Sequence, residues 1–475
     1  MSIFREYDIR GIFEEDLNKE KVIKIGYLLG NYIKKHDNKV AIGYDARTHS
    51  PILFEWLGLG LMLHGVEVYN LGMIPTPVAY FSTFHTDIKN SVMITGSHNP
   101  PQYNGFKITI NQSPFYGNEI QNLGKEMDTL DIRTPDIESH KKEPRKIDVL
   151  QDYIDFISKE FYFLKGWSEK IVFDCGNGVA SLALKQILEN LQLDTINLFF
   201  EPDGTFPNHH PDPSEEKNLV DLKRTLQENH ISIGIAYDGD ADRVALVSPN
   251  HNFKGDELAI LFARDIAKTK KNPIVIGEVK CSQIMYDEIN KIGSSVMYKT
   301  GHSNLKVKLK ELHADLACEM SGHIFFNDRY FGYDDAIYAG FRILELLYKE
   351  KEDGNNNPIS KLEKSLLALP KTYNTNEEKI LTTEDKKFES IKNLKCKLDV
   401  IWESQKGLHT DSQVPKDFPK IKDVIDIDGV RVIFENGWGL IRASNTTPTL
   451  VTRFEAYSQS DLESYKQCLL NLLVQ

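Results

Sequence analysis

Short apolar runs of strand length alternate with amphipathic stretches of helix length along most of the chain, a pattern typical of α/β architecture. The first cycle predicts strands over Val40–Tyr44, Val66–Leu71 and Ser91–Thr95. Between the first two, Ser50 and Pro51 predict the start of a helix, with serine as its N-cap and proline at its first position.

The same alternation recurs twice more. Further strands are predicted over Ile171–Phe173, Thr195–Phe200, Ile231–Tyr237 and Pro273–Gly277. Further helices are predicted over Ala180–Leu191, Asp256–Lys268 and Ala336–Lys349. The polar segments 128–146 and 351–358 have the composition of connections between such units.

The last 105 or so residues differ, because a hairpin signal at Asn436–Gly437 precedes a strand over Leu450–Ala456 and a terminal helix capped at Ser460–Asp461. We therefore predict an α/β protein of four domains: three similar mixed α/β domains and a smaller C-terminal α+β domain. The expected boundaries are 1–148, 149–251, 252–366 and 367–475.

Composition argues against several classes of protein. The 475 residues carry 57 Lys and Arg against 69 Asp and Glu, a net charge of −12, which disfavours a nucleic-acid binder. The longest apolar run, Trp56–Leu63, is far short of the roughly 20 residues that cross a bilayer, so no membrane partner is expected. Five cysteines without a C-x-x-C pair disfavour zinc cages and disulfides, and with no signal peptide apparent we expect a cytoplasmic protein.

The segment Thr95–Pro100, Thr-Gly-Ser-His-Asn-Pro, follows a predicted buried strand. A serine on a glycine-initiated turn at the carboxyl end of a strand is exposed and has backbone N–H groups behind it. Ser97 is therefore a candidate nucleophile or phosphate carrier. The alternative is an ordinary turn in which the serine and histidine are incidental.

Asp238, Asp240 and Asp242 follow another strand and offer hard oxygen ligands of the kind that Mg²⁺ or Ca²⁺ takes. Carboxylates ~4 Å apart repel by roughly 4 kcal/mol per pair at an effective dielectric near 20, so the cluster requires either solvation or a cation. The loop is not an EF-hand, because its twelfth position is Pro249. A solvated acidic turn is the alternative.

Three further sets of residues suit a phosphorylated sugar. Arg442–Pro448 combines an arginine fork, hydroxyls and backbone N–H groups, which match a phosphate, although it also has the composition of a polar turn. Glu319–His323 offers donors and acceptors for hydroxyl groups. Lys280 and His302 place cations after strands.

The glycine-rich segment Gly176–Ser181 follows a strand as a dinucleotide-binding turn would. Its sixth position is serine rather than glycine or alanine, and the nearest suitably spaced acid, Glu201, lies beside Pro202 in a predicted loop. The sequence therefore does not favour a nicotinamide or flavin site.

Taken together and in order, these motifs resemble the α-D-phosphohexomutase superfamily, and within it the bacterial phosphomannomutase/phosphoglucomutase family. The resemblance covers nearly the whole chain and rests on seven segments: 7–11, 95–100, 104–107, 238–243, 300–303, 319–323 and 442–448. It implies four domains around a central cleft, each contributing one loop.

By this resemblance, Ser97 would be the phosphoserine, and Asp238, Asp240 and Asp242, with a phosphoserine oxygen, would hold one Mg²⁺ per chain. Residues around the transferring group would be Arg10, Lys107, His302 and Arg243. Residues that bind the substrate would be Tyr7, Lys280, Glu319, Ser321, His323, Arg442, Ser444, Asn445 and Thr446.

The activity implied is interconversion of hexose 6-phosphate and hexose 1-phosphate, of mannose, glucose or both, with hexose 1,6-bisphosphate as intermediate and activator. The partners expected are sugar phosphates, for a monomer or a homodimer. A glucosamine-phosphate mutase, a metal-dependent phosphatase and a non-catalytic sugar-phosphate-binding protein remain alternatives.

Two positions depart from the family pattern, in which glycine is usual: Ala241 in the metal loop and Ala336 after Asp334-Asp335. If Ala241 must adopt a positive φ, alanine is expected to cost about 1 kcal/mol or more and to distort the loop.

Overall fold

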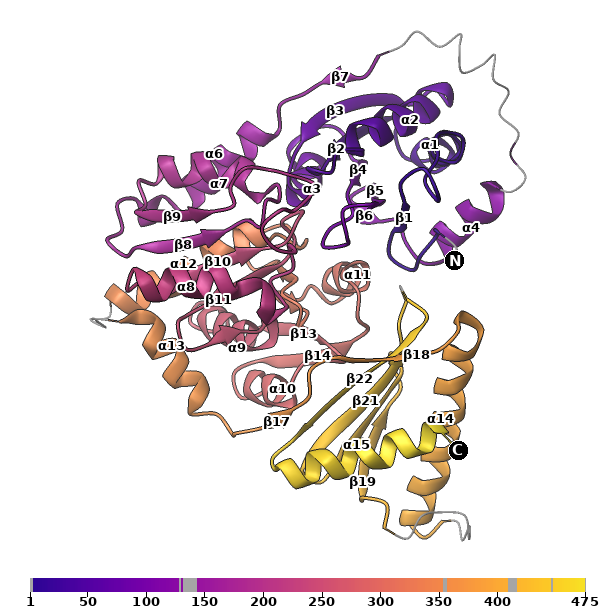
Figure 1. The fold of residues 1–475 in the computed structure, drawn as a ribbon, viewed down its shortest axis with the longest axis vertical. Coiled ribbons are helices and arrows are strands. Elements are labelled where there is room, and N and C mark those ends of the chain that lie inside the picture. The colour runs from indigo at the N-terminus through magenta and orange to yellow at the C-terminus, as the bar shows by residue number, and fades with distance from the viewer. Residues whose placement is uncertain are drawn as a thin grey trace.

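The computed structural model describes residues 3–127, 130, 143–352, 357–408, 417–445 and 447–474. Their strands form four sheets, and the strands of each sheet are consecutive in the chain (Figure 1). Three mixed α/β domains precede a smaller C-terminal domain, as the sequence predicts.

The first domain contains, in chain order, β1 (Ile9–Ile12), α1 (Lys19–Ile33), β2 (Lys39–Tyr44), α2 (Ser50–Leu63), β3 (Glu67–Met73), α3 (Thr76–His85), β4 (Ser91–Ile94), β5 (Tyr103–Ile110), β6 (Ser113–Pro114), α4 (Asn118–Met127) and β7 (Arg145–Lys146). The sheet order is β1-β5-β4-β2-β3-β7, with β6 beside β5. Because β4, β2 and β3 are parallel, the loops after β2 and β4 leave the sheet at one edge.

The second domain contains α6 (Leu150–Glu160), β8 (Ile171–Asp174), α7 (Ala180–Asn190), β9 (Thr195–Leu198), α8 (Val220–Glu228), β10 (Ile233–Tyr237), β11 (Val244–Val247) and β12 (Asn252–Phe253). Here β10, β8 and β9 are parallel, while β11 and β12 extend the sheet antiparallel.

The third domain contains α9 (Gly255–Ile266), β13 (Ile274–Glu278), α10 (Gln283–Ile289), β14 (Ser294–Tyr298), α11 (His302–Leu312), β15 (Leu316–Cys318), β16 (Ile324–Phe326), α12 (Ala336–Glu352) and α13 (Pro358–Leu367). Its sheet again has parallel strands, β14, β13 and β15, and one antiparallel strand, β16.

The fourth domain contains β17 (Tyr373–Asn374), β18 (Glu378–Leu381), α14 (Glu384–Gln405), β19 (Ile421–Ile425), β20 (Val430–Phe434), β21 (Gly437–Ala443), β22 (Thr449–Ala456) and α15 (Gln459–Val474). All of its strand pairs are antiparallel, and α14 and α15 contact the sheet (Figure 1). Since β12 belongs to the second sheet, we propose domain boundaries near 148, 253 and 366.

The hydrophobic cores divide the molecule differently from the sheets. One continuous cluster runs from Phe81 in the first domain through Tyr153 and Phe173 in the second to Tyr333 and Phe341 in the third. The fourth domain has a separate core between its sheet and its two long helices. The first three domains are therefore joined by one large apolar core, whereas the fourth has a core of its own and meets the third through a small cluster of Val279, Trp438 and Leu440.

Both predicted helix caps prove wrong. Ser50 is the first residue of α2, and its hydroxyl donates to Asp45 Oδ1 over 2.6 Å, so His49 occupies the cap without a side-chain bond. At α15, the oxygen that accepts the Asp461 N–H is Ser458 Oγ, at 3.1 Å, not Ser460. Ser50 and Ser460 both lie inside their helices rather than at the cap, and Ser50 bonds a tertiary partner instead.

The two predicted connections are only partly described. Residues 128, 129, 131–142 and 353–356 lie outside the described residues. Arg145–Lys146, predicted as connection, forms β7 beside β3. Lys351 lies within α12, and Asn357 accepts the Ser360 N–H to cap α13. The polar composition therefore concealed helix ends and a short edge strand.

Helices α1 and α2 pack closely at Gly60, where an added Cβ would overlap the Ile23 carbonyl oxygen. At Gly58, two residues away on α2, an added Cβ would meet only Val68, at 3.9 Å. We expect Gly60→Ala to lower the free energy of unfolding by about 1–3 kcal/mol, because the helices must separate. Gly58→Ala should raise it by up to about 1 kcal/mol through helix propensity.

Urea denaturation of both variants measures this difference. Equal effects of the two alanines would contradict the close approach of α1 and α2.

Candidate active site

The Ser97 loop follows β4 and is held by a buried ion pair. Ser97 has φ +51°, and its N–H donates to Thr95 Oγ1 over 2.8 Å. Arg47 donates to the carbonyl oxygens of Ser97 and Asn99 over 2.9 and 2.6 Å, while Asp45 accepts from Thr95 Oγ1 over 2.8 Å and from Arg47 Nε over 3.1 Å. The ion pair of Asp45 and Arg47 therefore holds the Ser97 loop in place from within the first domain.

The aspartate loop follows β10 in the second domain. Asp238 Oδ1 accepts the N–H groups of Asp242 and Arg243 over 3.0 and 3.1 Å, which curls the loop around this carboxylate. Ala241 has φ +66°, so the strain expected at this departure from the family pattern is present. Ala336 is the first residue of α12, with no positive φ, so its departure carries no such strain.

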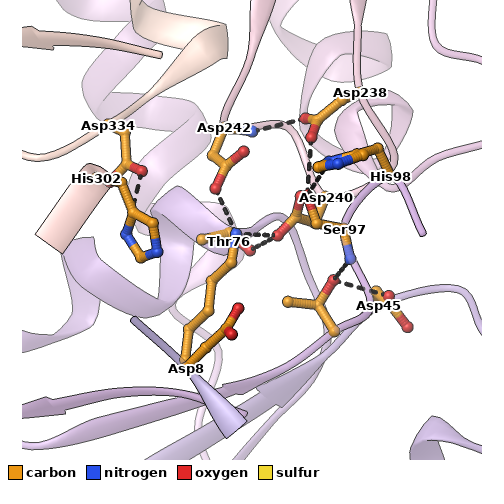
Figure 2. Close-up of polar contacts among 12 residues, drawn as sticks. Asp8, Asp45, Thr76, Ser97, His98, Asp238, Asp240, Asp242, His302 and Asp334 are labelled. Atoms are coloured by element: carbon orange, nitrogen blue, oxygen red, sulfur yellow. Dashed lines mark hydrogen bonds and ion pairs between the residues drawn. The ribbon is translucent and has the colours of Figure 1, made fainter. Parts of the chain in front are cut away.

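The two loops meet. Ser97 Oγ donates to Asp238 Oδ2 over 3.1 Å and lies 3.2 Å from His98 Nδ1 (Figure 2). An oxygen from each of Asp238, Asp240 and Asp242 lies within 4.8 Å of the others, and all three side chains are buried. The predicted carrier and the predicted metal ligands thus share one site.

Lys107 on β5 partly neutralises the aspartates. Its Nζ donates to Asp240 Oδ2 over 2.7 Å and also to Asp242. Thr76, at the start of α3, donates its hydroxyl to Asp240 Oδ2 over 2.6 Å (Figure 2). Two first-domain elements therefore reach into the aspartate loop of the second.

Lys107 does not fully neutralise the three aspartates. Burial raises the pKa of Asp238 well above its ordinary value, and the negative charges of Asp242 and Asp240 raise it further. Burial alone would lower the pKa of Lys107, but Asp240 and Asp242 outweigh burial and raise it. Asp240 Oδ1 and Asp242 Oδ1 are buried and make no hydrogen bond within the described part of the chain. Hard, unpartnered oxygens of this kind fit a divalent cation.

Arg10 contacts residues of the first domain, whereas Tyr7 connects this domain to the third. Arg10 donates to Asn99 Oδ1 over 2.9 Å and to Asp8. The Tyr7 hydroxyl donates to the Thr300 carbonyl over 2.7 Å, and its ring lies 6.1 Å from that of His302.

The third-domain residues lie on two loops. Glu319 accepts the Gly301 N–H over 2.6 Å and the Ser321 hydroxyl over 3.2 Å. His323 Nε2 accepts from Arg243 Nε over 2.9 Å, which ties this loop to the aspartate loop.

Lys280, in the loop after β13, is paired with Glu377 over 3.0 Å, and this ion pair lowers the pKa of Glu377 to about 2. Two buried arginines of the fourth domain hold the same loop. Arg431 donates to the Val279 carbonyl over 2.6 Å, and Arg453 donates to the Lys280 carbonyl.

In the fourth domain, Arg442 makes a two-pronged ion pair with Asp428, over 3.0 and 3.2 Å. Asp428 also accepts the Thr300 N–H over 3.0 Å, and Asn445 donates to the Tyr7 hydroxyl. The phosphate loop predicted around Arg442 therefore touches the first and third domains. Ser444 Oγ accepts the Thr447 N–H over 3.1 Å, and Thr446 lies outside the described residues.

Contacts thus link two groups of predicted residues. One contains Ser97, Lys107, Arg243, His323 and the three aspartates; the other contains Tyr7, His302, Glu319, Arg442 and Asn445, with the Tyr7 and His302 rings 6.1 Å apart. The rings of His302 and His323, stacked 5.9 Å apart, join the two groups. Sequence reasoning missed the charged or polar partners of these residues: Asp45, Arg47, Thr76, Asp212, Lys306, Asp334, Glu377 and Asp428. The position of Asp45-x-Arg47 after a buried strand was the one signal available for that pair.

The glycine-rich segment after β8 has a structural role. A Cβ at Gly178 would lie 2.7 Å from the Gly239 carbonyl oxygen, so the glycine admits the aspartate loop at close range. No dinucleotide is needed to explain its composition.

Comparison with known proteins assigns the family. Domain models of the phosphoglucomutase/phosphomannomutase family match residues 1–131 (α/β/α domain I), 151–251 (domain II), 254–368 (domain III) and 404–472 (C-terminal domain). The chain therefore belongs to the phosphoglucomutase/phosphomannomutase family.

Individual relatives cover almost the whole chain. A phosphomannomutase/phosphoglucomutase of Pseudomonas aeruginosa is 39% identical and covers 99% of this chain and 95% of its own. A phosphoglucomutase of Neisseria meningitidis is 37% identical over 97% and 94%. The crystal structure of a Burkholderia thailandensis family protein superposes with a TM-score of 0.84 at 33% identity, over 99% and 96%.

Across the described residues, no helix combines the length and apolar character that crossing a membrane requires.

We expect Arg47→Met to lower the free energy of unfolding by about 3–5 kcal/mol, because it leaves the Asp45 carboxylate and the loop carbonyls buried without their donor. Arg264, which pairs with Glu288 over 2.8 Å and is about one-third exposed, provides the matched control. Arg264→Met should cost at most about 1 kcal/mol. Urea denaturation distinguishes the two, and similar losses would contradict the role assigned to Arg47.

Proposed function

We propose that this chain interconverts hexose 6-phosphate and hexose 1-phosphate, of mannose, glucose or both, through a phosphoserine at Ser97 and a hexose 1,6-bisphosphate intermediate. The observation that carries the proposal is the 3.1 Å contact between Ser97 Oγ and Asp238 in a cluster of three buried carboxylates. Relatives at 37–39% identity named phosphoglucomutase or phosphomannomutase/phosphoglucomutase support it.

Asp238, Asp240 and Asp242 would hold one Mg²⁺ together with an oxygen of the phosphoserine. When bound, the ion would neutralise charge on the phosphoryl oxygens during transfer. The two unpartnered oxygens of Asp240 and Asp242 are the ligand atoms that remain available.

The chain's own residues would handle the rest of the transfer. As a sugar hydroxyl bonds to phosphorus, its proton must leave, and Ser97 Oγ must gain a proton as its bond to phosphorus breaks. Lys107, His302 and Arg10 are the candidates to move or balance these protons, and Arg243 would lie beside the phosphoryl group. The same groups would serve the second transfer in reverse.

A mutase must bind both ends of one sugar. Arg442, Ser444, Asn445 and Thr446 would hold the phosphate that is not reacting, while Glu319, Ser321, His323, Lys280 and Tyr7 would contact the sugar and its phosphates. In this structure Asp428 and Glu377 pair with Arg442 and Lys280, so substrate phosphate would replace carboxylate partners. The bisphosphate must then turn around, which requires the fourth domain, whose main core is separate, to loosen its contacts with the third.

We propose small sugar phosphates as the partners and the cytoplasm as the location; the location rests on the sequence alone. For the oligomeric state, the prediction is still a monomer or a homodimer.

Ser97→Ala should lower kcat at least about a thousandfold in a coupled assay on glucose 1-phosphate and mannose 1-phosphate, because the covalent carrier is lost. Ser158→Ala, which removes a helix-surface hydroxyl that bonds Asn190, is the control and should retain wild-type kcat. Intact-mass analysis should find one phosphate on the wild type and none on Ser97→Ala. Steady release of inorganic phosphate by the wild type would contradict a mutase and indicate a phosphatase.

Removing divalent cations with a chelator should abolish mutase activity, and added Mg²⁺ should restore it. Asp240→Asn should weaken Mg²⁺ binding about 10–100-fold by calorimetry, since a neutral amide replaces a charged ligand. Undiminished turnover after chelation would contradict the metal assignment.

A further inference from the structure

Asp334 and Lys306 are buried beside the aspartate loop but have no part in the roles described so far. Asp334 lies between β16 and α12 and is fully buried. Lys306 on α11 donates to Asp334 Oδ1 over 2.9 Å, and its Nζ lies 4.0 Å from the centre of the Tyr80 ring. One carboxylate oxygen is therefore occupied by a buried cation. The other, Oδ2, faces two histidines.

The hydrogen bond from Arg243 identifies the tautomer of His323. Arg243 Nε donates to His323 Nε2 over 2.9 Å, so Nε2 must be an acceptor. A neutral imidazole that accepts at Nε2 carries its proton on Nδ1. His323 Nδ1 lies 3.3 Å from Asp334 Oδ2 and 3.6 Å from Asp242 Oδ1.

Three buried atoms that make no hydrogen bond among the described residues therefore converge: His323 Nδ1, Asp334 Oδ2 and Asp242 Oδ1. The three side chains are also close enough to hold a metal ion. A metal would need the lone pair of Nδ1, whereas the bond at Nε2 leaves a proton there. A proton on Nδ1 that faces Asp334 Oδ2, the nearer of the two oxygens, accounts for the group without a second ion and leaves Asp242 Oδ1 for the proposed Mg²⁺.

His302 belongs to the same surroundings but interacts more weakly. Its Nδ1 lies 3.8 Å from Asp334 Oδ2, beyond hydrogen-bond distance (Figure 2). Burial lowers the pKa of His302 well below its ordinary value, and the positive charge of Lys306 lowers it further. The carboxylate is thus directed mainly at His323.

We propose that Asp334 is a positioning residue that acts on Arg243 through His323. Asp334 Oδ2, 3.3 Å from Nδ1, favours the tautomer with the proton on Nδ1, in which His323 Nε2 accepts from Arg243 Nε. Arg243 Nη1 lies 3.8 Å from Asp212 Oδ2, so the guanidinium is held from two sides beside the proposed position of the phosphoryl group. Lys306 holds the opposite oxygen and keeps Asp334 in place. This inference rests on the proposed function in one respect, the position of Arg243 beside the transferring phosphoryl group.

The tautomer is measured directly by two-bond ¹H–¹⁵N correlation spectra of the full-length chain labelled at histidine, with His323→Gln used to assign the signals. We expect a protonated Nδ1 and an unprotonated Nε2. A protonated Nε2 would overturn the proposal, as would loss of the Nδ1 proton on addition of Mg²⁺, which would make the trio a second cation site. This spectrum is read on the wild-type chain and does not depend on catalytic activity.

Asp334→Asn tests the consequence for catalysis. Asparagine offers one acceptor oxygen in place of two, so Lys306 and His323 compete for it. We expect kcat to fall about 10–100-fold with KM changed less than about threefold, and the Nδ1 signal to show mixed tautomers.

Asp328→Asn is the matched control, because Asp328 makes a partly buried two-pronged ion pair with Arg342, over 2.9 and 3.0 Å, in the same domain. It should lower thermal stability and leave kcat unchanged. Wild-type kcat in Asp334→Asn, or an equal fall of kcat in both variants, would overturn the proposal. An inactive wild type with the expected tautomer would instead contradict the proposed function alone.

Discussion

Three aspartates buried within reach of one another are the constraint around which the rest of this molecule is arranged. At ~4 Å and an effective dielectric near 20, each pair of charges repels by roughly 4 kcal/mol, so the loop holds its shape only if other groups offset the repulsion. Backbone N–H groups bind Asp238, and Lys107 and Thr76 come from another domain to bind Asp240. Neutralising the aspartates therefore also docks the first domain on the second.

Charged side chains also hold the loops that follow the strands in the other domains. Arg47, Arg243, Arg431 and Arg442 each join a loop to a carboxylate, a histidine or backbone carbonyls, so the loops that form the site are held by charge as well as by packing. Apolar packing continues through the first three domains, while the fourth domain has its own core. The proposed transfer site therefore lies on domains that share one core, while the proposed phosphate-binding loop belongs to a domain held to the third by a small apolar cluster and by Arg431 and Arg453.

Local patterns predicted the strands well, because β2 and β10 contain apolar runs that end just before Asp45 and Asp238, and β22 ends at the bend before α15. The motif loops followed from those strand ends. What the sequence could not reveal were choices made in three dimensions. Ser50 bonds Asp45 and Asn104 instead of capping its helix. The partnerships of Arg47 with the Ser97 loop and of Arg442 with Asp428 likewise require the fold.

The most direct test of the account is a ³¹P spectrum of the phosphorylated full-length chain titrated with Mn²⁺, which measures how near a bound cation lies to the phosphoserine. The account predicts strong paramagnetic broadening of the phosphoserine resonance that competing Mg²⁺ reverses. A phosphoserine resonance that stays sharp while Mn²⁺ binds would contradict it.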